Sequence, residues 1–139
     1  MKTLLIIPAY NEEDCITKVV DNLINNYPQY DYVIINDGST DHTSEICHKK
    51  GYEIIDLPIN LGLAGAFQTG LKYAYLKEYD FAMQMDADGQ HLPEYVDKLL
   101  EKMNEGYDIV IGSRFVTEKK PKSMQLQPCL FLFFFVLDA

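Results

Sequence analysis

The chain of 139 residues is 47% hydrophobic and 24% charged, which is the size and composition of one globular domain. Its formal net charge of −9 argues against a nucleic-acid-binding groove, which needs a basic surface. The three cysteines form no Cys-x-x-Cys pair, which favours reduced cytoplasmic thiols over a disulfide or zinc framework. The apolar run from Leu4 to Ile7 ends at Pro8 and is too short for the apolar region of a signal peptide.

Short apolar runs alternate with segments of helical periodicity along the chain. Strands are predicted at residues 3–7, 32–35, 52–55, 81–85 and 108–111, and helices over 16–24, 63–75 and 92–103, with one more helix after the second strand. We expect Asn11 to cap the first helix, Ser39 or Thr40 to cap the second, and Pro93 to lie in the first turn of the last. The alternation predicts an α/β fold with a mostly parallel sheet and helices on both faces.

In such a sheet, ligands bind beyond the carboxyl ends of the strands. After the fourth predicted strand the chain reads Asp86-Ala87-Asp88-Gly89-Gln90. The two carboxylates lie at positions i and i+2 and therefore point the same way. Such oxygen ligands suit Mg²⁺ or Mn²⁺, with substrate phosphates completing the shell. The alternative interpretation is a polar Asp-Gly turn that binds nothing.

Other motif interpretations fail. An EF-hand calcium loop that starts at Asp86 needs Gly at its sixth position and Glu at its twelfth, where the chain has His91 and Asp97. A haloacid-dehalogenase phosphatase carries Asp-x-Asp-Gly after its first strand, whereas here the motif follows the fourth. A dinucleotide-dependent oxidoreductase loses its main support because no G-x-G-x-x-G is present. A sugar-1-phosphate nucleotidyltransferase would need a glycine-rich loop after Ile7.

Further candidate ligand contacts follow the first, second and fifth predicted strands. Tyr10 offers a ring on which a base could stack, and Glu12 offers acceptors to a ribose or base. Asp37 is placed to accept a hydrogen bond from a base N–H. Arg114, the single arginine, could clamp a phosphate. Each also fits an ordinary loop or surface position, and the glycine-containing segment 60–65 is interpreted mainly as close helix packing.

Five motifs occur in one order along the chain, each beside the end of a predicted strand. They are IIPAYNEED, IINDGSTDHT, NLGLAGAFQTGLKYA, MQMDADGQHLPEYV and DIVIGSRF. Together they closely resemble the family 2 glycosyltransferases of GT-A fold, especially the dolichyl- and polyprenyl-phosphate sugar transferases, over residues 3–115. Asn36 departs from the family, which often has the first Asp of a pair there. The resemblance implies an inverting, metal-dependent enzyme that uses Mg²⁺ or Mn²⁺ and a UDP- or GDP-sugar.

The resemblance also implies roles for individual residues. The nucleoside pocket would be lined by Pro8, Tyr10, Glu12, Ile35 and Asp37. Asp86 and Ala87 would lie beside the nucleotide or the sugar. Asp88 and Gln90 would hold the metal, with Asp86 as a further candidate ligand. Arg114 would lie near the diphosphate or the acceptor phosphate, so that catalysis would depend on Asp86, Asp88 and Arg114.

The acceptor is expected to be a polyprenyl phosphate or a saccharide. A saccharide hydroxyl needs a general base, whereas a prenyl phosphate is already an anion. After Arg114 the only acids are Glu118 and Asp138, and neither belongs to a recognisable motif. The rival hypothesis is a catalytically incomplete module that only binds a nucleotide-sugar.

Residues 1–115 are expected to form the nucleotide-sugar-binding domain. Residues 116–139 would be an atypical tail, from a shortened chain, a frameshifted reading frame or a degenerate gene. The tail contains an apolar run from Cys129 to Leu137, which is too short to span a bilayer. We expect this run to cover an apolar patch within the chain or across a homodimer. The protein is expected in the cytoplasm, with peripheral contact to the inner face of the membrane as a further expectation.

Overall fold

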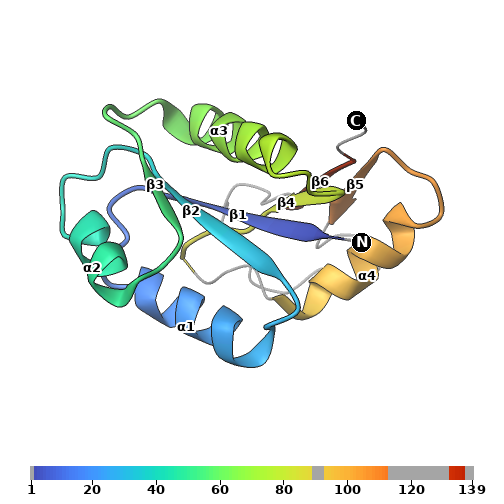
Figure 1. Ribbon diagram of the computed structural model, residues 1–139, viewed down its shortest axis with the longest axis horizontal. Coiled ribbons are helices and arrows are strands. Elements are labelled where there is room, and N and C mark those ends of the chain that lie inside the picture. Colours follow the sequence, from blue (N-terminus) through green and yellow to red (C-terminus); the bar gives the residue numbers. More distant parts are fainter. Residues whose placement is uncertain (1, 89–92, 113–131, 137–139) are drawn as a thin grey trace, which may run out of the picture.

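The computed structural model of the chain describes residues 2–88, 93–112 and 132–136. Its strands are β1 (Thr3–Ala9), β2 (Asp31–Asn36), β3 (Ile54–Asp56), β4 (Phe81–Gln84), β5 (Ile109–Gly112) and β6 (Leu132–Val136). Its helices are α1 (Ile16–Asn26), α2 (Thr43–Lys50), α3 (Gly62–Leu76) and α4 (Val96–Met103), the last preceded by the 3₁₀ turn η1 (Pro93–Tyr95). The predicted α/β alternation is therefore confirmed (Figure 1). Within these ranges no helix is long and apolar enough to cross a membrane.

The six strands form one sheet in the order β3-β2-β1-β4-β6-β5. The first four in this order are parallel to one another, whereas β6 runs antiparallel to both β4 and β5. The mostly parallel sheet is thus confirmed, and residues 132–136 of the final apolar run join it as strand β6. The division of the chain at residue 115 stays a prediction, because residues 113–131 lie outside the described ranges.

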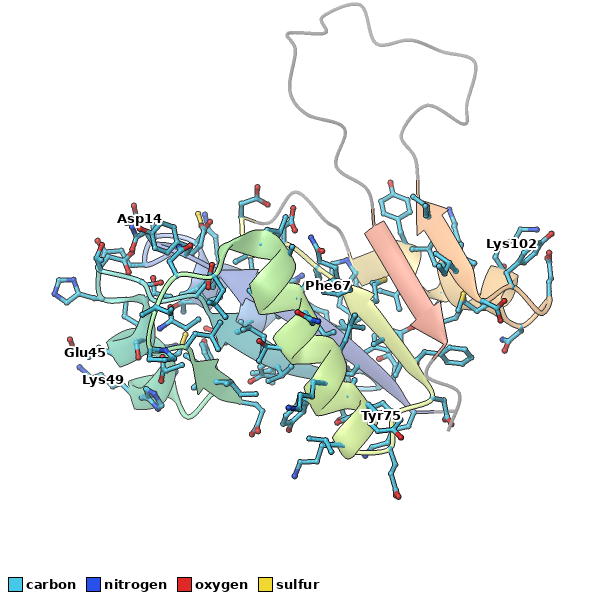
Figure 2. All side chains as sticks on the ribbon, turned by 90° about the horizontal axis from the view of Figure 1, so that it is seen from above. Asp14, Glu45, Lys49, Phe67, Tyr75 and Lys102 are labelled. Atoms are coloured by element: carbon cyan, nitrogen blue, oxygen red, sulfur yellow. The ribbon has the colours of Figure 1, made fainter. Side chains whose placement is uncertain are left out.

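Helices cover both faces of the sheet, as predicted. Along β1, Leu5 and Ile7 pack with residues of α1, α2 and α4, while Leu4 and Ile6 pack with residues of α3. Figure 1 shows α3 on one face and the other three helices on the opposite face. In Figure 2, which looks onto α3, Phe67 lies midway along the helix, where it packs against the core. Burial of each large apolar side chain contributes about 1.5–3 kcal/mol, so both layers stabilise β1 from opposite sides.

The capping residue of α1 differs from the prediction. The helix begins at Ile16 and Asn11 does not cap it. Asn11 instead has a φ of 56°, and its Oδ1 accepts hydrogen bonds from the N–H groups of Thr40 at 2.8 Å and Asp41 at 3.3 Å. A cap prediction considers only neighbours in sequence, whereas here the amide bridges to the loop after β2.

The cap of α2 also differs from the expected Ser39 or Thr40. The helix begins at Thr43, and Asp41 Oδ1 accepts hydrogen bonds from the Thr43 N–H at 2.9 Å and from its hydroxyl at 2.6 Å. A carboxylate at this place satisfies a backbone donor that has no partner within the helix. The helix therefore begins two or three residues later than a cap at Thr40 or Ser39 predicts.

Candidate active site

The carboxyl ends of β1, β2 and β4 meet the start of α3 around a cavity of about 210 Å³. It is lined by Pro8, Ala9, Tyr10, Glu12, Asp37, Leu63, Ala66, Asp86, Ala87 and Asp88. Parallel strands bring their carboxyl ends to one edge of the sheet, so residues from segments far apart in sequence gather there. The cavity therefore assembles three of the five motifs found in the sequence, together with part of a fourth at the start of α3.

Of the expected site residues within the described ranges, only Ile35 is absent from the lining of this cavity. Ile35 is fully buried and packs in the core cluster shared with α3. Alternation along β2 turns its side chain into the layer below α3, and its expected place in the nucleoside pocket stays a prediction. Gln90 and Arg114 lie outside the described residues, so their roles stay predictions.

The start of α3 contributes two lining residues that the sequence interpretation did not assign to the site. Leu63 is 58% exposed at the cavity, whereas Ala66 is fully buried and also belongs to the core. The sequence predicts close packing for this segment, and Ala66 does pack closely. The sequence does contain a sign that this segment also belongs to the ligand site. NLGLAGAFQTG occurs in order with four other motifs, and each motif lies beside the end of a predicted strand.

Asp37 is a buried carboxylate that lines the cavity and is only 3% exposed. Its Oδ1 accepts a hydrogen bond from the Leu61 N–H at 2.7 Å, and its own N–H donates to the Ala9 carbonyl at 2.8 Å. A buried carboxylate is costly unless its oxygens accept hydrogen bonds. These two bonds fix Asp37 between the end of β1 and the loop that leads into α3.

Tyr10 and Glu12 reach the cavity from the loop after β1. The Glu12 N–H donates to Thr43 Oγ1 at 2.9 Å, and the Thr43 hydroxyl in turn donates to Asp41. Thr43 is fully buried, so this bridge anchors the loop to the start of α2. Tyr10 is 48% exposed, which leaves its ring accessible to a planar ligand.

Acidic side chains gather at the mouth of the cavity. Asp86 is half-buried and accepts a hydrogen bond from Gln84 Nε2 at 3.0 Å, and Asp88 is exposed. Burial raises the pKa of Glu12, and the negative charges of Asp88, Asp41 and Asp86 raise it further. A diphosphate alone would be repelled by this charge, whereas a divalent cation would be attracted.

The donor set at the mouth fits Mg²⁺ or Mn²⁺ bound together with a nucleotide. Within the described ranges, no three His, Cys, Asp or Glu residues lie close enough to hold a metal ion by themselves. Asp86 and Asp88 nevertheless both line the cavity. One or two carboxylates completed by substrate phosphates are the usual shell of Mg²⁺ at a nucleotide site.

Comparison with known sequences points to one family. The model of the family described as Glycosyl transferase family 2 matches residues 4–137. The chain is 40% identical over 141 residues to the UDP-N-acetylglucosamine--dolichyl-phosphate N-acetylglucosaminyltransferase of Methanococcus voltae, with 88% of this chain and 55% of that protein covered. The chain spans about half the length of the curated relatives it matches.

Comparison with solved structures agrees on the fold. S. aureus TarS 1-349 in complex with UDP-GlcNAc matches with a TM-score of 0.61 at 26% identity, over 78% of this chain and 33% of that chain. Mannosyltransferase PcManGT from Pyrobaculum calidifontis, in complex with GDP-Man and Mn²⁺, matches with a TM-score of 0.55 at 24% identity, over 63% of this chain and 27% of that chain. The predicted GT-A fold is therefore confirmed.

Proposed function

Because the chain belongs to glycosyl transferase family 2, we propose that it binds a UDP- or GDP-sugar in the cavity and transfers the sugar to a polyprenyl-phosphate or saccharide acceptor. The observation that carries the proposal is the cavity itself. It combines a buried carboxylate, an accessible aromatic ring and an acidic mouth at the ends of three strands. The UDP-sugar and the dolichyl phosphate in the name of the M. voltae relative support this choice of donor and acceptor.

The nucleoside would be held by residues of the first two motifs. The half-exposed ring of Tyr10 offers a stacking surface for the base. Asp37 is held by Leu61 and Ala9 on the cavity wall, where its carboxylate can accept a base N–H. Uracil and guanine both carry a ring N–H, which agrees with a UDP- or GDP-sugar.

The diphosphate would lie at the acidic mouth. Asp86 and Asp88, with Gln90, would hold Mg²⁺ or Mn²⁺, which neutralises the negative charge that develops on the departing diphosphate. Burial raises the pKa of Glu12, and the negative charges of Asp88, Asp41 and Asp86 raise it further, which supports a cation site at this mouth. The Mn²⁺ in the PcManGT complex is a metal of the proposed kind in a protein of the same fold.

The transfer would be a single displacement at the anomeric carbon of the sugar. An acceptor oxygen forms the new bond as the bond to the diphosphate oxygen breaks, which inverts the configuration. A prenyl-phosphate oxygen is already an anion and needs no general base. We propose Arg114 as the cation beside the diphosphate or the acceptor phosphate, and a peripheral contact with the cytoplasmic face of the membrane that contains the acceptor.

Calorimetry with UDP and GDP, in Mn²⁺ and in EDTA, tests the donor site. We expect binding to be much tighter with Mn²⁺, because the acids repel a bare diphosphate. Asp88→Asn should remove most of this gain, a loss of about 1–3 kcal/mol for a charged ligand group. Asp108→Asn makes the same charge change at an exposed position before β5 and should leave binding unchanged.

Equal nucleotide affinity with and without the metal would contradict the metal site. A second assay supplies a polyprenyl phosphate and a saccharide separately and measures release of the nucleoside diphosphate. We expect turnover with the polyprenyl phosphate and none with the saccharide. Nucleotide binding without turnover on either acceptor would instead identify a module that binds nucleotide-sugar without transferring it.

A further inference from the structure

Asn36 is a buried amide that ends β2 and directly precedes Asp37. It is 3% exposed, and both ends of its side chain are hydrogen-bonded. Its Nδ2 donates to Asp56 Oδ1 at 2.6 Å, and its Oδ1 accepts a hydrogen bond from the Ser39 N–H at 3.2 Å. The amide therefore links the end of β3 to the turn that follows β2.

Asp56 is itself held from α2. The Ser44 hydroxyl donates to Asp56 Oδ1 at 2.8 Å, and His48 Nε2 lies 2.6 Å from Asp56 Oδ2. Burial raises the pKa of Asp56, but hydrogen bonds from Asn36, His48 and Ser44 outweigh it and hold the pKa below its ordinary value. Asp56 is thus an ionised acceptor, and the residue opposite it has to be a donor.

We propose that Asn36 and Asp56 form a complementary pair that positions Asp37 for the nucleotide. The pair fixes the Ser39 N–H on one side of Asp37, while Leu61 and Ala9 fix Asp37 itself. Asp56 also connects the turn after β2 to Ser44 and His48 of α2. No residue of α2 lines the cavity. The role assigned to this positioning pair rests on the proposed function, because it supposes that Asp37 contacts a nucleotide.

Exchanging the two side chains tests the pair. Asn36→Asp places two carboxylates at hydrogen-bond distance, so they repel when both are ionised and form a bridge when they share one proton. The double variant Asn36→Asp/Asp56→Asn restores one donor and one acceptor in reversed order. The titratable groups that face Asp56 are His48 and the Cys47 thiol, whose pKa is raised to about 11 by burial and by Asp56.

The first readout is UDP affinity with Mn²⁺ at about pH 5 and about pH 8, because two carboxylates that share a site have one strongly raised pKa. Asn36→Asp should bind about tenfold more weakly than wild type at the higher pH and lose less at the lower pH. The double variant should return close to wild type at both. Asn25→Asp adds the same charge at an exposed position on α1 and should show neither effect.

The second readout is amide hydrogen exchange of Ser39, which needs no nucleotide. Exchange of the Ser39 amide should be faster in Asn36→Asp than in the double variant at the same pH. In Asn36→Asp, repulsion from Asp56 displaces the residue 36 side chain, whose oxygen accepts the Ser39 N–H in the wild type. If Asn36→Asp does not fold, Asp56→Ala takes its place and should weaken UDP binding and speed this exchange at both pH values.

The outcomes separate the two hypotheses. A wild-type chain that binds no nucleotide would overturn the proposed function, while Ser39 exchange still decides whether the pair holds the turn. A wild-type chain that binds UDP, with a folded Asn36→Asp variant that binds it equally well at about pH 8, would overturn the positioning role alone. Failure of the double variant to recover affinity would overturn it as well.

Discussion

Asp37 joins the fold and the proposed chemistry in one side chain. It is buried, it lines the cavity, and its Oδ1 is engaged by the Leu61 N–H. An ionised carboxylate has room for about four hydrogen bonds, so a base N–H can be added without displacing Leu61. The same carboxylate can therefore hold the loop before α3 and distinguish between bases.

Asp37→Asn should change which base is preferred. The new amide oxygen can still accept the Leu61 N–H, which turns the amide N–H₂ toward the base. Uracil and guanine present a ring N–H at this place, whereas cytosine presents a ring acceptor. We expect wild type to prefer UDP and GDP, and the variant to shift toward CDP by about tenfold, equivalent to about 1.4 kcal/mol. A competition series of UDP, GDP, CDP and ADP measures the shift.

Metal dependence provides the control for this substitution, because Asp37 is not among the proposed metal ligands. Tighter binding in Mn²⁺ than in EDTA should persist in Asp37→Asn. A wild-type protein that binds all four diphosphates equally would refute the role of Asp37 in base selection.

At the scale of elements, the turn after β2 and the loop before α3 are in close contact. Gly38 has a φ of 67°, and a Cβ placed on it would lie 2.7 Å from the Asn60 backbone N and 2.8 Å from the Ile59 backbone C. Only glycine combines a left-handed backbone with so close an approach. This contact, together with the Asp37–Leu61 hydrogen bond, holds two cavity-forming loops against each other.

Gly38→Ala should therefore cost more stability than Gly51→Ala. Gly51 has a similar φ of 72° but nothing within 4 Å of an added Cβ, so it loses only the left-handed preference, about 1 kcal/mol. Gly38→Ala adds overpacking against backbone, about 1–3 kcal/mol more. Urea denaturation of both variants measures the difference, and only Gly38→Ala should also weaken nucleotide binding. Equal losses of stability would show that the two loops separate without cost.

At the scale of the whole molecule, the sheet depends on a strand from the end of the chain. β6 pairs with β4 on one side and with β5 on the other. Among the described strands, β5 is connected to the rest of the sheet through β6. Its residues 132–136 belong to the apolar run noted in the sequence. The cavity lies on β1, β2, β4 and α3, away from β5. Stability and ligand binding should therefore respond differently to loss of β6.

Deleting residues 132–139 should lower Tm and cause aggregation, because it leaves β5 without a partner and opens an edge of β4. Deleting only residues 137–139 leaves β6 intact and is the matched control. Thermal unfolding and light scattering measure both effects. Any protein that stays folded should still bind nucleotide with Mn²⁺. If the variant that lacks residues 132–139 is more soluble than the full chain and equally stable to heat, β6 contributes nothing to the stability of the sheet.

Local patterns in the sequence determined the strands and helices, because apolar periodicity follows directly from the geometry of each element. The same patterns located the cavity, since parallel strands bring the residues after their carboxyl ends together. Tyr10, Asp37 and Asp88 could therefore be predicted as neighbours. The membrane contact, the homodimer and the roles of the individual site residues stay predictions.

The tertiary structure alone decided the features that depend on partners distant in sequence. Asn11 bonds to Thr40 and Asp41 across two loops instead of capping α1. Asn36 departs from the family pattern and faces Asp56 twenty residues later. The sequence of the final apolar run does not indicate which strands it pairs with. In the structure, its residues 132–136 form β6, which lies antiparallel between β4 and β5. Hydrogen bonds between loops and the choice of strand partners are set by the folded arrangement, because no local periodicity encodes them.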